Sequence, residues 1–181
     1  MNKEELREGL MRLHEYVKPL DFNSVFIEEG EEAPMDTLLL GARIGEDLSL
    51  DISCNFANAP GFGDILHLYG ELNLSPMIEE NPAAFSEEVV LRMANELNKS
   101  LPVGQIIYLT EDSQGKAQRV AGIRYTMLTD LAGEKELKKC VEIIEMLLNI
   151  YEILCSTLYL LLEGDSLPKA METLSKILDG E

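Results

Sequence analysis

Two residues of the chain, His67 and Asp64, are of types that could together do acid–base chemistry. An imidazole oriented by a carboxylate can accept and return a proton near neutral pH, which would suit a small hydrolase. Such an enzyme also needs a nucleophile, and no serine or cysteine is tied to the pair by its spacing. The thiol of Cys54 falls on the opposite, apolar face of its predicted strand. A hydrolase using His67 with Asp64 is therefore the alternative hypothesis, and we expect no catalytic site.

The remaining carboxylates lack the spacing of a metal site. Three aspartates do not follow the pattern of a calcium-binding loop. Three glutamates on the predicted helix Glu134–Glu163 have no accompanying Glu-x-x-His motif. These carboxylates are Asp47, Asp51 and Asp64, and Glu142, Glu145 and Glu152. The glycines of residues 61–63 stand between two strands, which predicts a turn rather than a phosphate-binding loop. We expect neither a metal nor an organic cofactor.

The charge of the chain excludes several classes of partner. There are 33 acidic and 15 basic residues, which give a net charge of −18 and a pI near 4.4. Phosphate contacts need clustered Lys and Arg, so we expect no nucleic acid, and an anionic membrane surface is equally disfavoured. An acidic surface instead suits partners that carry Lys or Arg.

The cysteines and the N-terminal residues indicate a cytoplasmic protein. Cys54, Cys140 and Cys155 lie in apolar contexts, and their spacing matches neither a disulfide framework nor a zinc site. Buried free thiols indicate a reducing compartment. The N-terminal run MNKEELREGL is charged and lacks the apolar segment of a secretory signal.

Hydrophobic spacing predicts one α+β domain over residues 1–181, with residues 163–181 as an appended helix. Helices are predicted at Lys3–Val17, from Asn81 to Lys99, at Glu134–Glu163 and at Leu167–Leu178, and strands at Thr37–Ile44, Leu48–Phe56, Leu66–Leu74, Gln105–Glu111 and Gln118–Leu128. The order is α-β-β-β-α-β-β-α plus the short C-terminal helix. The short connections between strands predict an antiparallel sheet with one face in water.

The predicted helix Glu134–Glu163 carries a thin polar stripe. Its six polar residues recur at steps of three, four, three, four and seven, which aligns them on one helical face. They are Glu142, Glu145, Asn149, Glu152, Ser156 and Glu163. The helix is long enough to cross a membrane, but each glutamate would cost roughly 2–3 kcal/mol in lipid. We therefore expect a helix of a water-soluble protein, covered by a sheet and by another helix or a second subunit.

The order of elements carries a resemblance. A leading helix, a three-strand meander, a helix, a two-strand hairpin and a long closing helix resemble the type III secretion chaperone-like fold, which includes class I secretion chaperones and YbjN-like bacterial proteins. The sequence of Leu91–Asp130 also resembles that of YbjN-like proteins, with a helix carrying the pair Leu97-Asn98 before the hairpin. The resemblance implies a homodimer without catalytic residues, and by analogy a polypeptide client. The helix Leu167–Leu178 is additional to the family pattern.

These observations predict a dimeric, non-catalytic protein-binding module, chaperone-like or regulatory. The partner would bind through apolar grooves and exposed strand edges. Dimerisation is expected through the helix Glu134–Glu163 or the hairpin Gln105–Leu128. The second strand of this hairpin has few positions that are purely polar, so a second subunit could cover it. The residues expected to contact a partner are Asp51, Tyr69, Glu71, Ile123, Tyr125 and Met127.

Overall fold

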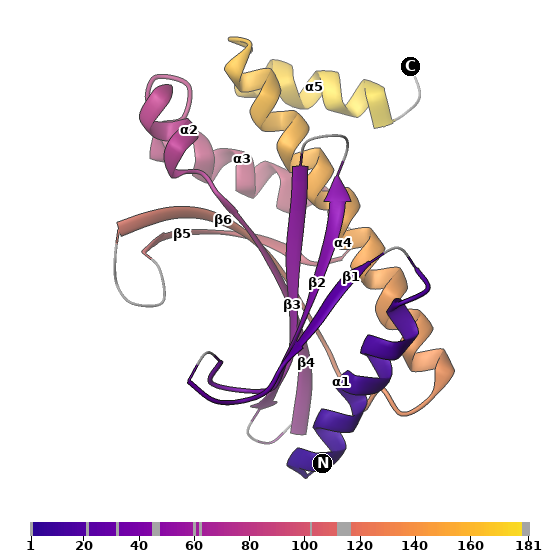
Figure 1. Cartoon of the computed structure of the whole chain (residues 1–181). Coiled ribbons are helices and arrows are strands. Elements are labelled where there is room, and N and C mark those ends of the chain that lie inside the picture. Colours follow the sequence, from indigo (N-terminus) through magenta and orange to yellow (C-terminus); the bar gives the residue numbers. More distant parts are fainter. Residues whose placement is uncertain are drawn as a thin grey trace. The chain divides into compact units, whose positions relative to one another are not determined.

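Six strands and five helices make up the described part of the computed structural model (Figure 1). The description covers residues 2–20, 22–31, 33–44, 48–59, 61, 63–101, 103–111 and 117–178. The helices are α1 (Lys3–Val17), α2 (Ser75–Glu80), α3 (Glu87–Ser100), α4 (Glu134–Leu162) and α5 (Leu167–Leu178). The strands are β1 (Asn23–Ile27), β2 (Thr37–Ile44), β3 (Leu48–Ala59), β4 (Gly63–Asn73), β5 (Gln105–Glu111) and β6 (Ala117–Met127). The predicted α+β class is confirmed, because these strands form an open antiparallel sheet in the order β1-β2-β3-β4-β6-β5.

Contacts between residues group the chain into two compact units. Unit 1 comprises Met1–Glu71 and Arg124–Leu148, and unit 2 comprises Leu72–Ile123 and Asn149–Glu181. Strands β4 and β6 and helix α4 contribute residues to both units. The assignment of a single domain to residues 1–181 stays a prediction.

Unit 1 is built on the meander of β1 to β4. Adjacent strands pair antiparallel, and alternate side chains of each strand enter the core. The buried side chains of this face are Leu38, Leu40, Leu50, Ile52, Cys54, Phe56, Leu66 and Leu68. Helix α1 packs against β1, β2 and β3, and it buries Leu10, Leu13 and Val17. In β3 and β4 these buried side chains alternate with side chains that reach solvent, as expected of an antiparallel sheet with one face in water.

Two arginines fasten α1 within unit 1. Arg7 donates from Nε and Nη2 to Asp36, at 3.0 and 2.9 Å, and Asp36 also accepts the Glu29 N–H at 2.8 Å. Arg12 Nε donates to the carbonyl oxygen of Leu131 at 2.9 Å. The helix begins at a capping box, because the side chains of Asn2 and Glu5 bond each other's backbone N–H groups. The helix is therefore fixed at its start and along its length.

A glycine allows α1 to approach the segment before α4 closely. A Cβ at Gly9 would lie 2.8 Å from the Asp130 carbonyl oxygen and 3.6 Å from the Phe56 ring. Since Phe56 belongs to the buried face of the sheet, α1 lies on that face. Any larger residue at position 9 would push the helix away from its place.

Unit 2 contains α2, α3, β5, α5 and parts of β6 and α4. Helix α3 packs against β5. Asn98 joins the two, because its Nδ2 donates to the Ile106 carbonyl oxygen and its Oδ1 accepts the Ile106 N–H, both at 2.8 Å. Leu154 of α4 and Ala170 of α5 are fully buried, so the additional C-terminal helix carries part of the core.

The helix predicted to start at Asn81 begins later. Asn81 ends a short helix, α2, which was not predicted, and α3 starts at Glu87. Ser86 is the N-cap, and its Oγ accepts the Val89 N–H at 3.4 Å. Because the start moves, Val90 is the buried residue of that turn and Val89 is only half-buried.

The polar stripe of α4 is confirmed. All six of its predicted residues are exposed, while Cys140, Ile144, Leu147 and Leu154 are almost fully buried. Among the described helices, α4 alone is long and apolar enough to cross a membrane by length and composition. The core helix of a water-soluble domain meets the same criterion, and the alternation of exposed and buried residues is that of a core helix.

Candidate partner-binding face of the sheet

The four strands of unit 1 carry an outer face, opposite to the buried one. The pairing register places Val25 opposite Leu39, Leu39 opposite Ser53 and Ser53 opposite Tyr69, so these side chains form one row across the sheet. Neighbouring rows contain Ile27, Thr37, Asn55 and His67 on one side and Asn23, Gly41 and Asp51 on the other. We call these three rows, with Glu71 at the end of β4, the outer face.

Every residue of the outer face is at least partly accessible to solvent. Val25 is 59% exposed, which is unusual for a large apolar side chain on a strand, and Asp51 and Glu71 are also exposed. Leu39 and Tyr69 are half-buried. An accessible, partly apolar sheet face is a typical place for another polypeptide to bind.

Acidic and aromatic groups gather at one end of the outer face. The Tyr69 hydroxyl donates to Glu71 Oε2 at 3.3 Å. Burial, and then the charge of Glu71, raise the pKa of Tyr69 to about 12, so the phenol stays protonated at neutral pH. The carboxylate of Asp51 lies over Gly41, where a Cβ would be only 3.1 Å from its Oδ1. This end of the face therefore presents two carboxylates and a neutral phenol, with the cation of Arg124 close enough to lower the pKa of that phenol slightly.

Strand β1 forms one edge of the sheet. It pairs with β2 on one side and comes first in the strand order, so its other side has no strand partner among the described residues. Such an edge presents backbone N–H and C=O groups that can pair with an added strand. Val25 stands in the middle of this edge, where it would meet such a strand.

Three other residues expected to contact a partner lie on β6. Ile123 is 1% exposed and Met127 is 8% exposed, so the chain itself covers both side chains. Tyr125 is half-buried and is the one of the three that a partner could reach directly. Exposure thus distinguishes the predicted residues: Asp51, Tyr69 and Glu71 reach solvent on β3 and β4, whereas Ile123 and Met127 do not.

The residues of the alternative hydrolase do not form a dyad. Strands β3 and β4 pair without a bulge from Ile52–Gly70 to Ala59–Gly63. Asp64 and His67 are three residues apart on this regular strand, so their side chains project to opposite faces. A base and its orienting carboxylate must lie within hydrogen-bond reach, and this geometry does not allow it.

The three thiols are free, and burial raises the pKa of each. Cys54 and Cys140 are buried free thiols, and burial raises both pKa values, that of Cys140 to about 12. Cys155 is half-buried, and burial raises its pKa to about 11, so all three thiols stay protonated at neutral pH. No group of three or more His, Cys, Asp or Glu among the described residues is placed to hold a metal ion. Asp47 and Phe62 lie outside the described residues.

Sequence reasoning missed the edge strand and its exposed valine. The segment Asn23–Ile27 reads NSVFI, a short run rich in β-branched and aromatic residues between Pro19 and Gly30. That composition is typical of a strand, and its alternation would have placed Val25 on the outer face. Comparison with known proteins adds no identification, because no protein-family model and no curated protein sequence matches this chain.

Proposed function

We propose that the protein is a non-catalytic binding module that takes an extended polypeptide segment of a partner along β1 and the outer face. The supporting observation is the row Val25–Leu39–Ser53–Tyr69, which remains accessible and ends at an open strand edge. A partner strand added to β1 would extend this row by one side chain. Its backbone would pair with the edge while its apolar side chain packs on Val25.

Charge selects the partner. Asp51 and Glu71 give the outer face an acidic end, and the whole chain carries a net charge of −18. A segment with Lys or Arg beside apolar residues therefore fits this face better than an acidic one. The charged contacts are solvent-exposed, so they contribute mainly to the rate of association and weaken with salt.

The proposal includes assembly as a homodimer in the cytoplasm and a chaperone-like or regulatory role. The secretion chaperone-like resemblance supports the dimer and the peptide client, and the protonated, unpaired thiols suit a reducing compartment. The opposite projection of Asp64 and His67 leaves the hydrolase alternative without a catalytic pair.

A synthetic seven-residue peptide, Val-Thr-Lys-Thr-Val-Thr-Lys, tests the proposal, because its valines and lysines fall on one face of an extended chain. Its affinity is measured by fluorescence anisotropy in low salt and again in about 0.3 M salt. Asn23→Lys, on the outer face of β1 itself, should weaken binding roughly three- to tenfold in low salt, and the difference should shrink in high salt. His67→Ala should weaken binding less than Asn23→Lys does, because it removes one side chain of the outer face without adding an opposing charge.

Two controls make the result specific. Asn95→Lys introduces the same charge change on an exposed residue of α3, and it should weaken binding much less than Asn23→Lys. A peptide methylated on alternate backbone nitrogens cannot pair with the β1 edge and should bind poorly. Equal losses for Asn23→Lys and Asn95→Lys would reduce the effect to net charge and refute the site. If His67→Ala alone abolished the cellular activity while peptide binding survived, the hydrolase hypothesis would replace this one.

A further inference from the structure

Strand β1 also carries an aromatic ring on the face of the sheet opposite to the outer face, which we call the core face. Ser24 pairs with Leu40 and Phe26 pairs with Leu38, and both leucines are fully buried, so Ser24 and Phe26 project to the core face. Phe26 is nevertheless only half-buried. Among the described residues β1 has a strand neighbour on one side only, so the sheet covers the ring from that side alone.

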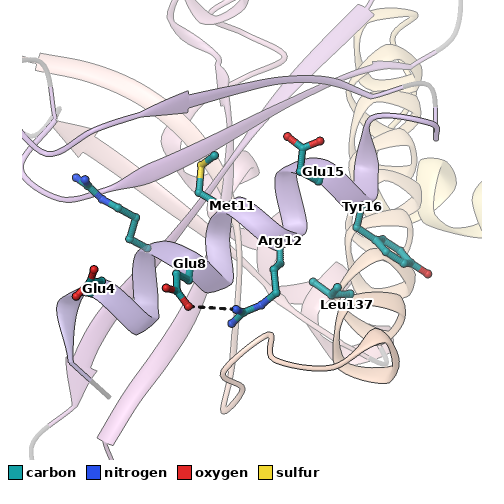
Figure 2. A pocket seen from close by; sticks show the side chains of 8 residues that line it. Glu4, Glu8, Met11, Arg12, Glu15, Tyr16 and Leu137 are labelled. Atoms are coloured by element: carbon teal, nitrogen blue, oxygen red, sulfur yellow. Dashed lines mark ion pairs between the residues drawn. The ribbon is translucent and has the colours of Figure 1, made fainter.

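Helix α1 lies on the core face and borders the β1 edge. Arg7 lies 3.7 Å from Glu28, which directly follows β1. His14 comes about two turns after Arg7, so both residues lie on the same side of the helix. The opposite side of α1 carries Tyr16, which extends toward Leu137 at the start of α4 (Figure 2). The side with Arg7 and His14 is therefore the one that faces the β1 edge.

His14 is level with the middle of β1. The two turns from Arg7 to His14 extend about 10.5 Å along the helix axis, which is the length of roughly three residues of a strand. Because α1 ends shortly before β1 begins, the two elements run in opposite directions, and three residues back from Glu28 is Val25. His14 is half-buried, and its Nδ1 is enclosed without a hydrogen-bond partner among the described residues.

A strand that adds to β1 must place its side chains alternately on the two faces of the sheet. Those on the outer face meet Val25, and those between them meet Phe26 on the core face. An inward side chain would therefore lie against the ring of Phe26, beside the side of α1 that carries His14. A large apolar side chain covers the ring, whereas a lysine would lose its water there without gaining a partner.

We infer that Phe26 determines the specificity of the strand-edge site: the partner segment carries a large apolar residue that faces the core, next to the one that packs on Val25. Its Lys or Arg residues then face outward only. This inference rests on the proposed function, because it takes the β1 edge as the place of binding. It adds the chemistry of the second face of the bound segment.

Two peptides that differ in one side chain test the inference. The first is Val-Thr-Lys-Thr-Val-Thr-Lys, whose threonines face the core when its valines face Val25. The second has isoleucine in place of the central threonine, so both keep a β-branched residue there. The isoleucine peptide should bind the wild-type protein roughly five- to tenfold more tightly, because it buries more apolar surface. A peptide with lysine at the same position should bind more weakly than either.

A matched pair of variants assigns this preference to the ring. Phe26→Thr should reduce the ratio of the two affinities to less than about twofold, because the surface that the isoleucine covers is gone. Ile27→Thr makes a similar change on the outer face of the same strand and should preserve the ratio. Circular dichroism confirms that each variant is folded, and a folded Phe26→Thr protein with the wild-type ratio would contradict the assignment.

The wild-type measurements decide the question even if Phe26→Thr does not fold. Equal affinities of the threonine and isoleucine peptides would overturn the inference and leave the strand-edge site standing. Failure of both peptides to bind would refute the strand-edge site itself, and the inference with it. Tighter binding of a peptide with a central glutamate than of the isoleucine peptide would assign the place to an ion pair with His14, and it would also overturn the inference.

Discussion

Asp36 joins the N-terminal helix to the chain that connects β1 and β2. Its carboxylate is 9% exposed, and it accepts two hydrogen bonds from Arg7 and one from the Glu29 N–H. These bonds, with the one from Arg7 as the largest cause, hold the pKa of Asp36 below its ordinary value of 3.8. A carboxylate so engaged stabilises the folded state only while it is ionised.

Asp36→Asn should therefore lower the free energy of unfolding by about 1–2 kcal/mol near neutral pH, because a bond to a charged group is replaced by a weaker one. The folded pKa is depressed, so the contribution of Asp36 is fully present above pH 3.8 and is lost as the pH falls through the lower folded pKa. Urea unfolding of both proteins from about pH 6 down to about pH 3 should show the two stabilities converging at the acid end.

Glu96→Gln provides the matched control. Glu96 pairs with Lys99 at 2.7 Å on the exposed face of α3, where such pairs contribute little. A pH-independent difference between wild type and Asp36→Asn would contradict the assignment of this effect to the carboxylate.

Asn98 connects α3 to β5, because its side-chain amide bonds the backbone of β5 as a neighbouring strand would. Its amide both donates to and accepts from the backbone of Ile106. Asn98→Ala should cost roughly 2 kcal/mol of stability, because an N–H and a C=O that are only partly accessible lose their partners. Chemical denaturation measures the loss, and amide hydrogen exchange at Ile106 should accelerate. Asn95→Ala, an exposed change on the same helix, should have little effect; an equal loss there would assign the cost to helix propensity.

Elements with long, regular patterns could be predicted from the sequence. The bounds of α1, β2, β5 and α5 are as predicted, because each combines a clear period with a Gly or Pro near its end. Helix α2 could not be predicted, because six residues are too few to show a helical period. The predicted start of α3 was wrong, because Asn81-Pro82 has the residue types typical of an N-cap and a first helical position. The N-cap in the structure is Ser86, whose sequence signal is weaker.

Only part of the candidate site could be predicted from the sequence, because the rest depends on how segments that are distant in the chain pack together. Alternation along single strands placed Asp51, Tyr69 and Glu71 on the wet face, and that placement holds. Which strands lie side by side depends on pairing over long sequence separations, which local patterns do not encode. For the same reason the burial of Ile123 and Met127 could not be predicted, and the apolar strand that carries them was predicted to contact a partner.

At the scale of the assembly, we expect a homodimer of about twice the 20.2 kDa chain mass in light scattering at micromolar concentration. Two exposed apolar side chains mark the elements expected to dimerise: Leu128, 67% exposed after β6, and Tyr159, 60% exposed on α4. Tyr159→Asp or Leu128→Asp should give a folded monomer, because a carboxylate buried without a partner opposes association. Leu91→Asp, on α3, should leave the mass unchanged.

Leu147→Asp tests the packing inside the chain and not the contact between two copies. Leu147 is only 1% exposed within the chain, so a carboxylate there should unfold the protein rather than separate two copies. A wild-type protein that scatters as a monomer would contradict the dimer.

The division of unit 1 between two stretches of chain has a consequence for synthesis in the cell. Its sheet belongs to Met1–Glu71, but Leu131 and Cys140, which help to complete its core, follow about fifty residues of unit 2. At about 5–20 residues per second, a ribosome needs roughly 3–10 s to translate that interval. During those seconds the leucine-rich face of the nascent sheet lacks part of its cover. A ribosome-associated chaperone, or slow codons placed after residue 148, would then influence the yield of native protein more than the final stability does.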